Sequence, residues 1–281
     1  MRIANVRDRL CIVTSDGAID VHTASKGRFP ADAAEVYDHW SEFREWAEAG
    51  VDAEATAYVP EDVGSPSPQP RQVFGIGANY ADHIEEAGIE APKKPAIFTK
   101  FSTCICGPAT DIELSTDRAD WEVELVVVLG TRAERISADN AWAHVAGITV
   151  GQDISERRVQ FQKPIMQLDL GKSFPTFGPM GPDLVTIDEV DDPDDLPNTC
   201  LLNGEVMQSS RTSNLIFDVP TLISYISHHV TMLPGDVVFT GTPSGVGSTR
   251  DPKRYLQPGD EIESHITGVG TMHNRCVARV D

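Results

Sequence analysis

The stretch Asp120-Trp-Glu122-Val-Glu124-Leu-Val-Val-Val-Leu-Gly130 decides the fold class, because it is rich in β-branched residues and carries two acids two positions apart. β-Branched residues favour strands, on which successive side chains point to opposite faces. We therefore expect Glu122 and Glu124 on one face, about 7 Å apart, and Trp121 and Val123 on the other. On a helix the two acids would diverge.

The face that carries the two acids continues with Val126 and Val128, so the carboxylates are predicted to lie at the edge of a core. Two like charges there are costly unless a cation neutralises them. Ligation by oxygen alone favours a hard ion, Mg²⁺, Mn²⁺ or Ca²⁺, over zinc. Asp153, which ends an apolar strand candidate, is the expected third ligand. The alternative is that alternating acids merely mark a solvated strand face.

Short strands dominate the chain beyond residue 73. The best later helix covers residues 217–229 and begins at Asp218-Val-Pro220. Strands that outnumber helices and do not alternate with them argue against a doubly wound sheet. The sequence therefore predicts an α+β, β-rich architecture with a closed or rolled mixed sheet. The strand candidates are residues 73–77, 96–100, 121–129, 145–152, 199–202, 236–240 and 260–266.

Residues 1–70 are predicted to form a small N-terminal domain and linker, with the main domain over residues 71–281. A hairpin is expected over residues 9–21, because two apolar runs flank Asp16-Gly17. Residues 33–49 carry large apolar side chains at helical spacing. The proline-rich segment 64–70 is predicted to be a stiff linker.

The charge of the chain limits its partners. Its 281 residues carry 23 Lys and Arg against 43 Asp and Glu, a net charge of −20. Such a chain repels nucleic acid and anionic membrane surfaces, so we expect no nucleic-acid or membrane partner. No apolar run approaches the roughly 18 residues of a membrane span. The first residues lack the apolar core of a signal peptide, and a cytoplasmic protein is therefore expected.

Residues 79–88 are typical of a short helix, with Asn79 as its N-cap and Gly88 as its stop. His83 and Glu86 are three residues apart, so they share one face of that helix. A histidine oriented by a carboxylate can deprotonate a water molecule. The alternative is an ordinary surface pair.

Two segments shaped by glycine and proline complete the set of candidates. Residues 171–182 form a predicted loop with a lone Lys172, which could bind a carboxylate or stabilise an enolate. The alternative is a solvent-exposed lysine. Residues 240–247 offer backbone donors and hydroxyls that suit a carboxylate, or form an ordinary tight turn.

Taken together and in order, these segments resemble the fumarylacetoacetate hydrolase superfamily, from about residue 73 to residue 280. The resemblance implies a mixed β-roll like the C-terminal domain of that family, preceded by a small N-terminal unit, and a homodimer. The motifs that carry it are 77–83 with Glu86, Glu122-Val-Glu124, 151–153 with Arg157 and Gln160, 171–174, 202–205, 241–247, 258–260 and 268–270.

The resemblance also implies a role for each candidate residue. It implies that Glu122, Glu124 and Asp153 hold Mg²⁺ or Mn²⁺, and that Lys172 binds substrate and stabilises negative charge. By the same resemblance His83 and Glu86 are the dyad that activates water. The positions that match substrate-facing residues of the family are Arg157, Gln160 and Thr242.

The expected reaction is metal-dependent hydrolysis of the carbon–carbon bond of an acylpyruvate such as fumarylpyruvate or acetylpyruvate. Oxaloacetate decarboxylation and isomerisation of 2-hydroxyhepta-2,4-diene-1,7-dioate remain open, because neither requires an attacking water. Sugar-acid lyases and dehydratases of the same fold also remain open. A more remote alternative is a metal-stabilised binding domain without catalysis, although no ligand or dyad residue is replaced.

Overall fold

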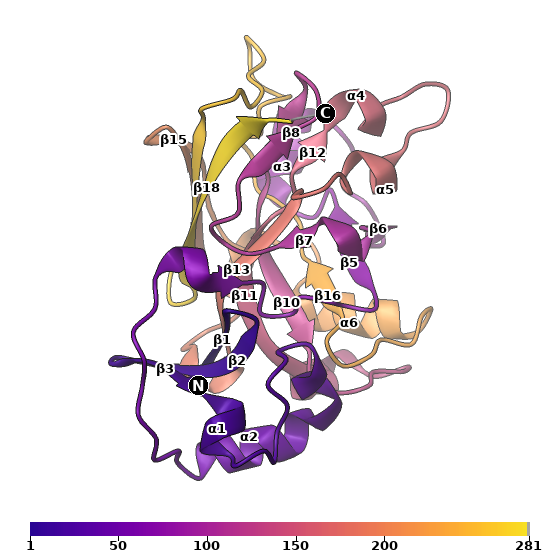
Figure 1. Ribbon diagram of the computed structural model, residues 1–281. Helices are drawn as coiled ribbons and strands as arrows, with labels where there is room; N and C mark the ends of the chain where they lie inside the picture. The colour runs from indigo at the N-terminus through magenta and orange to yellow at the C-terminus, as the bar shows by residue number, and fades with distance from the viewer. Residues whose placement is uncertain (280–281) are drawn as a thin grey trace.

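The computed structural model describes residues 1–279, so the last two residues of the predicted main domain lie outside the described part. Its centre is a mixed sheet that brings strands from both ends of the chain together (Figure 1). The path has two ends, so the sheet is open and does not close on itself. Its strand order is β3 (Gly17–Asp20), β2 (Arg9–Thr14), β1 (Arg2–Val6), β13 (Gly178–Val185), β11 (Val145–Gln152), β10 (Val123–Leu129), β16 (Val237–Phe239), β5 (Val73–Gly77) and β6 (Ala96–Thr99).

Three short additions and a second sheet complete the β structure. The strand β4 (Val63–Gly64) pairs with β1, β7 (Ile105–Cys106) pairs with β13, and β9 (Ala119–Asp120) pairs with β12 (Ser155–Glu156). The second sheet has the order β15 (Glu205–Arg211), β14 (Pro197–Leu202), β17 (Glu261–Ile266), β18 (Gly270–Ala278) and β8 (Ile112–Leu114). Leu125 and Val127 of β10 belong to one core with Ile262 and Met272 of this second sheet.

Helices are short and lie around the sheets, which agrees with the predicted α+β class (Figure 1). The α-helices are α1 (Val21–Ala24), α2 (Trp40–Glu48), α3 (Ala81–Ala87), α4 (Arg157–Gln160), α5 (Leu168–Gly171) and α6 (Val219–Ser227). The 3₁₀ helices are η1 (Glu35–His39), η2 (Pro60–Asp62), η3 (Ser102–Cys104), η4 (Ala138–His144), η5 (Ile187–Glu189) and η6 (Thr212–Asn214). No helix in the described residues is both long and apolar enough to cross a membrane.

The N-terminal residues extend the main sheet. Strand β1 pairs antiparallel with β13, and Trp40 and Phe43 of α2 share a core with Val126 and Val128 of β10. The proline-rich segment is packed as well, because Ser67 Oγ donates to the carbonyl of Gly235 at 2.8 Å. The predicted stiff linker is therefore a buried connection, while the domain boundary near residue 70 stays a prediction.

Two local predictions were wrong. The loop expected over residues 171–182 ends in β13, a buried strand of the main sheet that contains Pro179 and Pro182. The helix α3 has Tyr80 as its N-cap residue, without a side-chain cap. The Asn79 amide instead donates to the carbonyls of Phe217 and Thr240, at 3.0 and 2.8 Å. This contact ties the start of α3 to two distant segments.

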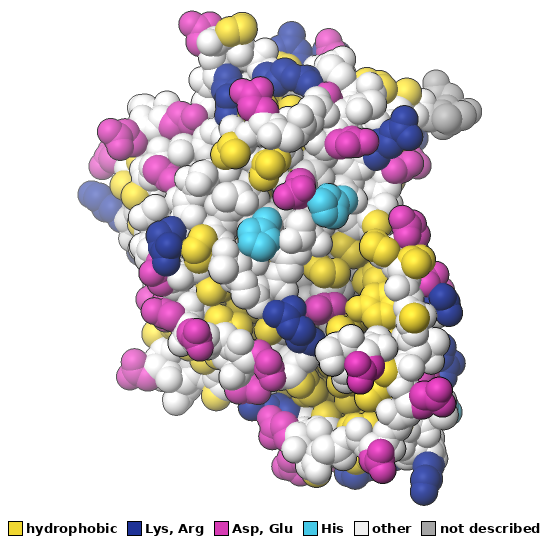
Figure 2. Space-filling view, turned by 90° about the vertical axis from the view of Figure 1, so that its left-hand side faces the viewer, with side chains coloured by type: hydrophobic (Ala, Val, Ile, Leu, Met, Phe, Trp, Pro, Cys, Tyr) yellow, Lys and Arg dark blue, Asp and Glu magenta, His cyan; other side chains and the backbone are white. Residues whose placement is uncertain are grey.

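The surface reflects the acidic composition. Figure 2 shows acidic side chains spread over one whole face of the molecule, with basic side chains scattered among them. A dianion that approaches the protein therefore meets a generally repulsive surface. Local positive charge at a binding site must overcome that repulsion.

Candidate active site

Strands β10 and β11 bring three carboxylates together. They pair antiparallel with Val123 opposite Gln152, so Asp153, which directly follows β11, lies beside Glu122. The Asp153 N–H donates to the Glu122 carbonyl at 2.9 Å. Glu122, Glu124 and Asp153 each offer an oxygen within 4.8 Å of the others, and all three are buried. The alternative of a solvated strand face is therefore wrong.

The three carboxylates differ in their electrostatic environment. Burial and the neighbouring carboxylates of Asp153 and Glu122 raise the pKa of Glu124 well above its usual value. Burial also opposes ionisation of Glu122, but Lys172 and Arg157 outweigh it and lower the pKa of that carboxyl. The Glu124 carboxylate accepts only the Gly241 N–H, at 2.7 Å, among the described residues.

These residues fit a hard divalent cation. The donor set is three carboxylates, and such cations prefer oxygen ligands. A cation among them would neutralise the crowding of like charges that keeps the pKa of Glu124 high. The predicted ligand triad is therefore assembled in one place.

Lys172 lies at the end of α5 and reaches the carboxylate cluster. Its Nζ donates to Glu122 Oε2 at 2.7 Å, to Asp153 Oδ2 at 2.6 Å and to Ser155 Oγ at 2.9 Å. The residue is 3% exposed, so the alternative of a solvent-exposed lysine is wrong. An ammonium group has three hydrogens, and these contacts use all of them. Lys172 therefore acts on a ligand mainly through its charge.

A second buried lysine, Lys100, escaped the sequence analysis. Its Nζ donates to Asp153 Oδ1 at 2.6 Å, to the Phe177 carbonyl at 3.1 Å and to the Lys172 carbonyl. Its side chain is fully buried. Lys100 thus holds one carboxylate of the cluster and the backbone of the other lysine. The only signal in the sequence was a lysine at the end of the strand candidate 96–100.

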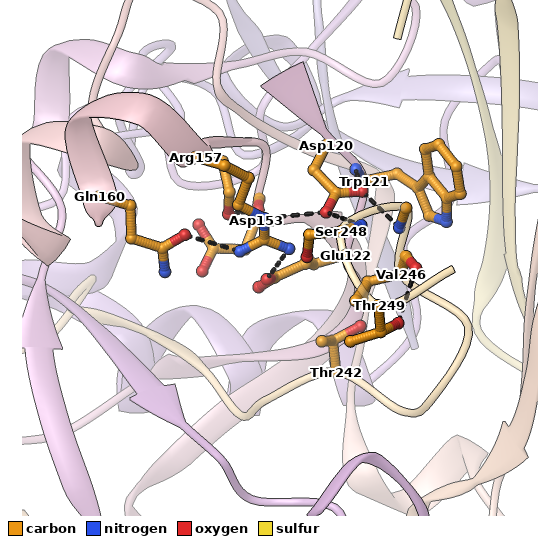
Figure 3. A network of polar contacts seen from close by, with 12 residues as sticks. Asp120, Trp121, Glu122, Asp153, Arg157, Gln160, Thr242, Val246, Ser248 and Thr249 are labelled. Carbon is orange, nitrogen blue, oxygen red and sulfur yellow. Dashed lines mark hydrogen bonds and ion pairs between the residues drawn. The ribbon is translucent and has the colours of Figure 1, made fainter. Parts of the chain in front are cut away.

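Arg157 at the start of α4 links the three-carboxylate cluster to a fourth acid, Asp120 (Figure 3). Its guanidinium donates to Asp120 Oδ2 at 2.8 Å and to Gln160 Oε1 at 2.7 Å, and it pairs with Glu122 Oε1 at 2.7 Å. Asp120, also missed from the sequence, accepts the N–H groups of Gly247 and Ser248 at 2.7 and 2.9 Å. The predicted residues Arg157 and Gln160 are therefore held in place together.

The predicted dyad is close but loosely connected. His83 Nδ1 lies 3.5 Å from Glu86 Oε2, and this nitrogen has no hydrogen-bond partner among the described residues. Both Glu86 oxygens lie 3.1 Å from the Gly245 N–H. The side chains are 18% and 26% exposed; His83 lines the cavity wall, whereas Glu86 lies outside the lining.

Thr242 is already engaged by neighbouring strands. Its hydroxyl donates to the Val123 carbonyl at 3.0 Å and accepts from the Gln208 amide at 2.8 Å. Gln208 in turn accepts the Val123 N–H at 3.0 Å. Thr242 therefore fixes the start of β10 while it also lines the cavity.

Six of the nine candidate residues line one cavity of about 380 Å³, and Glu86, Glu124 and Asp153 lie outside its lining. This volume suits a small organic molecule. Cationic, polar and apolar side chains line it together, which suits an anion with a short carbon chain. The polar lining residues include His83, Glu122, Arg157, Gln160, Lys172 and Thr242, and the apolar ones include Ile76, Ile89, Phe98, Phe161, Met166 and Leu168.

Comparison with known proteins identifies the family of this chain. The family model for the fumarylacetoacetate (FAA) hydrolase C-terminal domain matches residues 72–277. The mitochondrial oxaloacetate tautomerase FAHD2A of Bos taurus is 46% identical over 215 residues, which cover 76% of this chain and 68% of that protein.

Two solved structures are similar over the whole fold. An HpcE-type protein of Mycobacterium smegmatis is 50% identical, with a TM-score of 0.95 and full coverage of both chains. A maleylpyruvate hydrolase of Sphingobium sp. SYK-6, in complex with manganese(II) and pyruvate, is 25% identical with a TM-score of 0.81, again with full coverage of both. This chain therefore belongs to the fumarylacetoacetate hydrolase family of enzymes.

Proposed function

We propose that this enzyme interconverts the keto and enol forms of a small dicarboxylic keto acid such as oxaloacetate, with Mg²⁺ or Mn²⁺ bound at Glu122, Glu124 and Asp153. The observation that carries the proposal is the buried carboxylate triad with Lys172 bonded to two of its members. The similarity to oxaloacetate tautomerases supports keto–enol chemistry better than the acylpyruvate hydrolysis expected from the sequence.

A divalent ion held by Glu122, Glu124 and Asp153 would supply Lewis acidity next to the keto acid. In this proposal Arg157 and Gln160 receive the substrate carboxylate. Three of the five guanidinium N–H groups of Arg157 are used in the contacts described, and two remain. The Gln160 oxygen is held by Arg157, which leaves its NH₂ group to donate.

Tautomerisation moves one proton from carbon to the keto oxygen, and it consumes no water. His83 is the lining residue suited to carry that proton, because the other titratable lining groups, Glu122, Arg157 and Lys172, are joined in buried ion pairs. The positive charge of Lys172 stabilises the negative charge that develops on oxygen.

The test is the ultraviolet absorbance of the oxaloacetate enol, followed after metal-stripped protein is mixed with Mg²⁺ or Mn²⁺. We expect faster approach to equilibrium with metal, and no acceleration by a Glu124→Gln variant. An unchanged rate with the metal-loaded wild type would refute the proposal.

Hydrolysis is the second candidate, and the proximity of His83 to Glu86 favours it. If the enzyme is a hydrolase, we expect metal-dependent release of pyruvate from acetylpyruvate or fumarylpyruvate. Pyruvate release at a rate above oxaloacetate tautomerisation would make hydrolysis the main activity.

We also infer that two copies of the chain associate. Phe161, Ile165, Met166 and Leu170, in and beside the segment that joins α4 to α5, are all more than half exposed. Contiguous exposed apolar side chains commonly mark association surfaces. Sedimentation over a range of concentrations should give a dimer, and a monomer throughout would refute the inference.

A further inference from the structure

We propose that a basic pocket beside the active-site cavity captures dianionic keto acids through their second carboxylate. This inference rests on the proposed function, because it concerns the substrate of the same site. The basic pocket has a volume of about 300 Å³. Four cations and two aromatic side chains line it, namely Arg118, Arg157, Arg158, Lys253, Phe161 and Tyr255.

The basic pocket adjoins the active-site cavity. Arg157 and Phe161 line both spaces. Strands β9 and β12 pair with Ala119 opposite Glu156, so the Arg157 N–H donates to the Arg118 carbonyl at 3.0 Å. Arg118 therefore sits next to the residue whose guanidinium contacts Glu122. A ligand in the basic pocket lies beside the same arginine that faces the cavity.

Within residues 1–279, two of the four cations have no acidic partner. Arg158 pairs with Asp117, and Arg157 pairs with Asp120 and Glu122. Neither Arg118 nor Lys253 pairs with an acid in residues 1–279, and the Arg118 guanidinium stacks 5.2 Å from the centre of the Tyr255 ring. Acids outnumber bases by 43 to 23 in this chain, so free cations gathered in one place indicate an anion site.

The local charge has a direct consequence for substrate choice. A protein of net charge −20 repels a dianion more strongly than a monoanion. A positive pocket at the cavity offsets this repulsion, and its attraction also grows with ligand charge. The basic pocket should therefore favour a keto acid with two carboxylates over one with a single carboxylate.

The test compares oxaloacetate with pyruvate, which has the same keto acid head but no second carboxylate. Binding of each to the Mg²⁺-loaded full chain is measured by ligand-observed NMR at low and high salt. The variant is Arg118→Gln with Lys253→Gln. The control, Lys26→Gln with Arg132→Gln, removes the same charge from exposed positions outside the pocket.

We expect the pocket variant to weaken oxaloacetate binding by about three- to tenfold, and pyruvate binding by less than twofold. Oxaloacetate binding to the pocket variant should also depend less on salt concentration. In turnover experiments the variant should show a higher KM. The control should match the wild type. Equal weakening of both ligands, or a pocket variant that matches the control, would overturn the proposal.

The outcomes separate this inference from the proposed function. If the wild type binds oxaloacetate as predicted but does not interconvert its tautomers, the anion-pocket proposal stands and the proposed function is refuted. If the wild type interconverts the tautomers and the pocket variant binds oxaloacetate as tightly as the wild type does, only the anion-pocket proposal is refuted. If the wild type binds neither oxaloacetate nor pyruvate, both proposals are refuted.

Discussion

The carboxylate cluster between β10 and β11 and the dyad on α3 each contribute one side chain, Glu122 and His83, to the same cavity, but they are built differently. The cluster is buried, and two of its members, Glu122 and Asp153, are held by Lys100, Lys172 and Arg157 through contacts of 2.6–2.7 Å. The dyad is partly exposed and separated by 3.5 Å. The cluster is thus fixed by the sheets, whereas the position of the dyad depends on one short helix.

This difference separates the two candidate reactions. Keto–enol interconversion needs the charge arrangement of the cluster and one proton carrier. Hydrolysis also needs a carboxylate that orients the histidine toward water. The following experiments test whether the rigid cluster carries most of the catalysis.

The largest effect is expected for Glu124→Gln, which keeps the side-chain shape and removes one anionic ligand. Metal-dependent tautomerisation should fall by at least about 100-fold, because loss of a ligand costs more than loss of a residue that supports one. Calorimetric titration with Mn²⁺ should show weakened binding. A Glu90→Gln variant, at an exposed position, is the control. Full activity in Glu124→Gln would remove the cluster from the mechanism.

The next effect is expected for His83→Ala. Loss of a proton carrier should slow tautomerisation by on the order of 100-fold, while Mn²⁺ binding stays the same. Stopped-flow absorbance of the enol and the same calorimetric titration provide the two readings. A loss of less than about threefold would assign the proton transfer to another group.

Lys100→Met tests the support of the cluster through stability. It leaves Asp153 with one lysine instead of two and removes a buried ion pair. The free energy of unfolding should fall by about 3–5 kcal/mol, measured by urea denaturation of the metal-free protein. Lys93→Met, at an exposed lysine, should have little effect. Equal stability of both variants would mean that Lys100 does not stabilise the fold.

The smallest effect is expected for Glu86→Gln. Its carboxylate is held by the Gly245 N–H and does not hydrogen-bond to His83, so tautomerisation should change by less than about threefold. Hydrolysis of acetylpyruvate, if present, should fall much further. A large loss of tautomerisation activity would mean that Glu86 and His83 form a hydrogen bond when substrate binds.

The cluster was accessible from the sequence because it follows from strand geometry. A period of two puts Glu122 and Glu124 on one face, and the end of an apolar strand identifies Asp153. Lys100 and Asp120 were not accessible in this way. Their partners come from segments more than 35 residues away, and no local pattern indicates such pairing.

Strand β13 illustrates a second limit. Its two prolines argued for a loop, since proline removes a backbone donor from a sheet. The segment is nevertheless a strand between β1 and β11, where the register shifts between Ile148 and Val150. Tertiary burial outweighed local preference here. The reaction itself was also hard to predict from the resemblance, because the same residues serve several reactions of keto acids.

The turn at Gly241 joins the two regions. Its N–H holds Glu124, its φ is +107°, and a Cβ at this position would lie 2.8 Å from the Cβ of Asn79, which fixes the start of α3. Any side chain at residue 241 would press against Asn79 at the start of α3. It would also displace the Gly241 N–H that donates to Glu124. A substitution at Gly241 would therefore disturb the metal-ligand cluster and the dyad together.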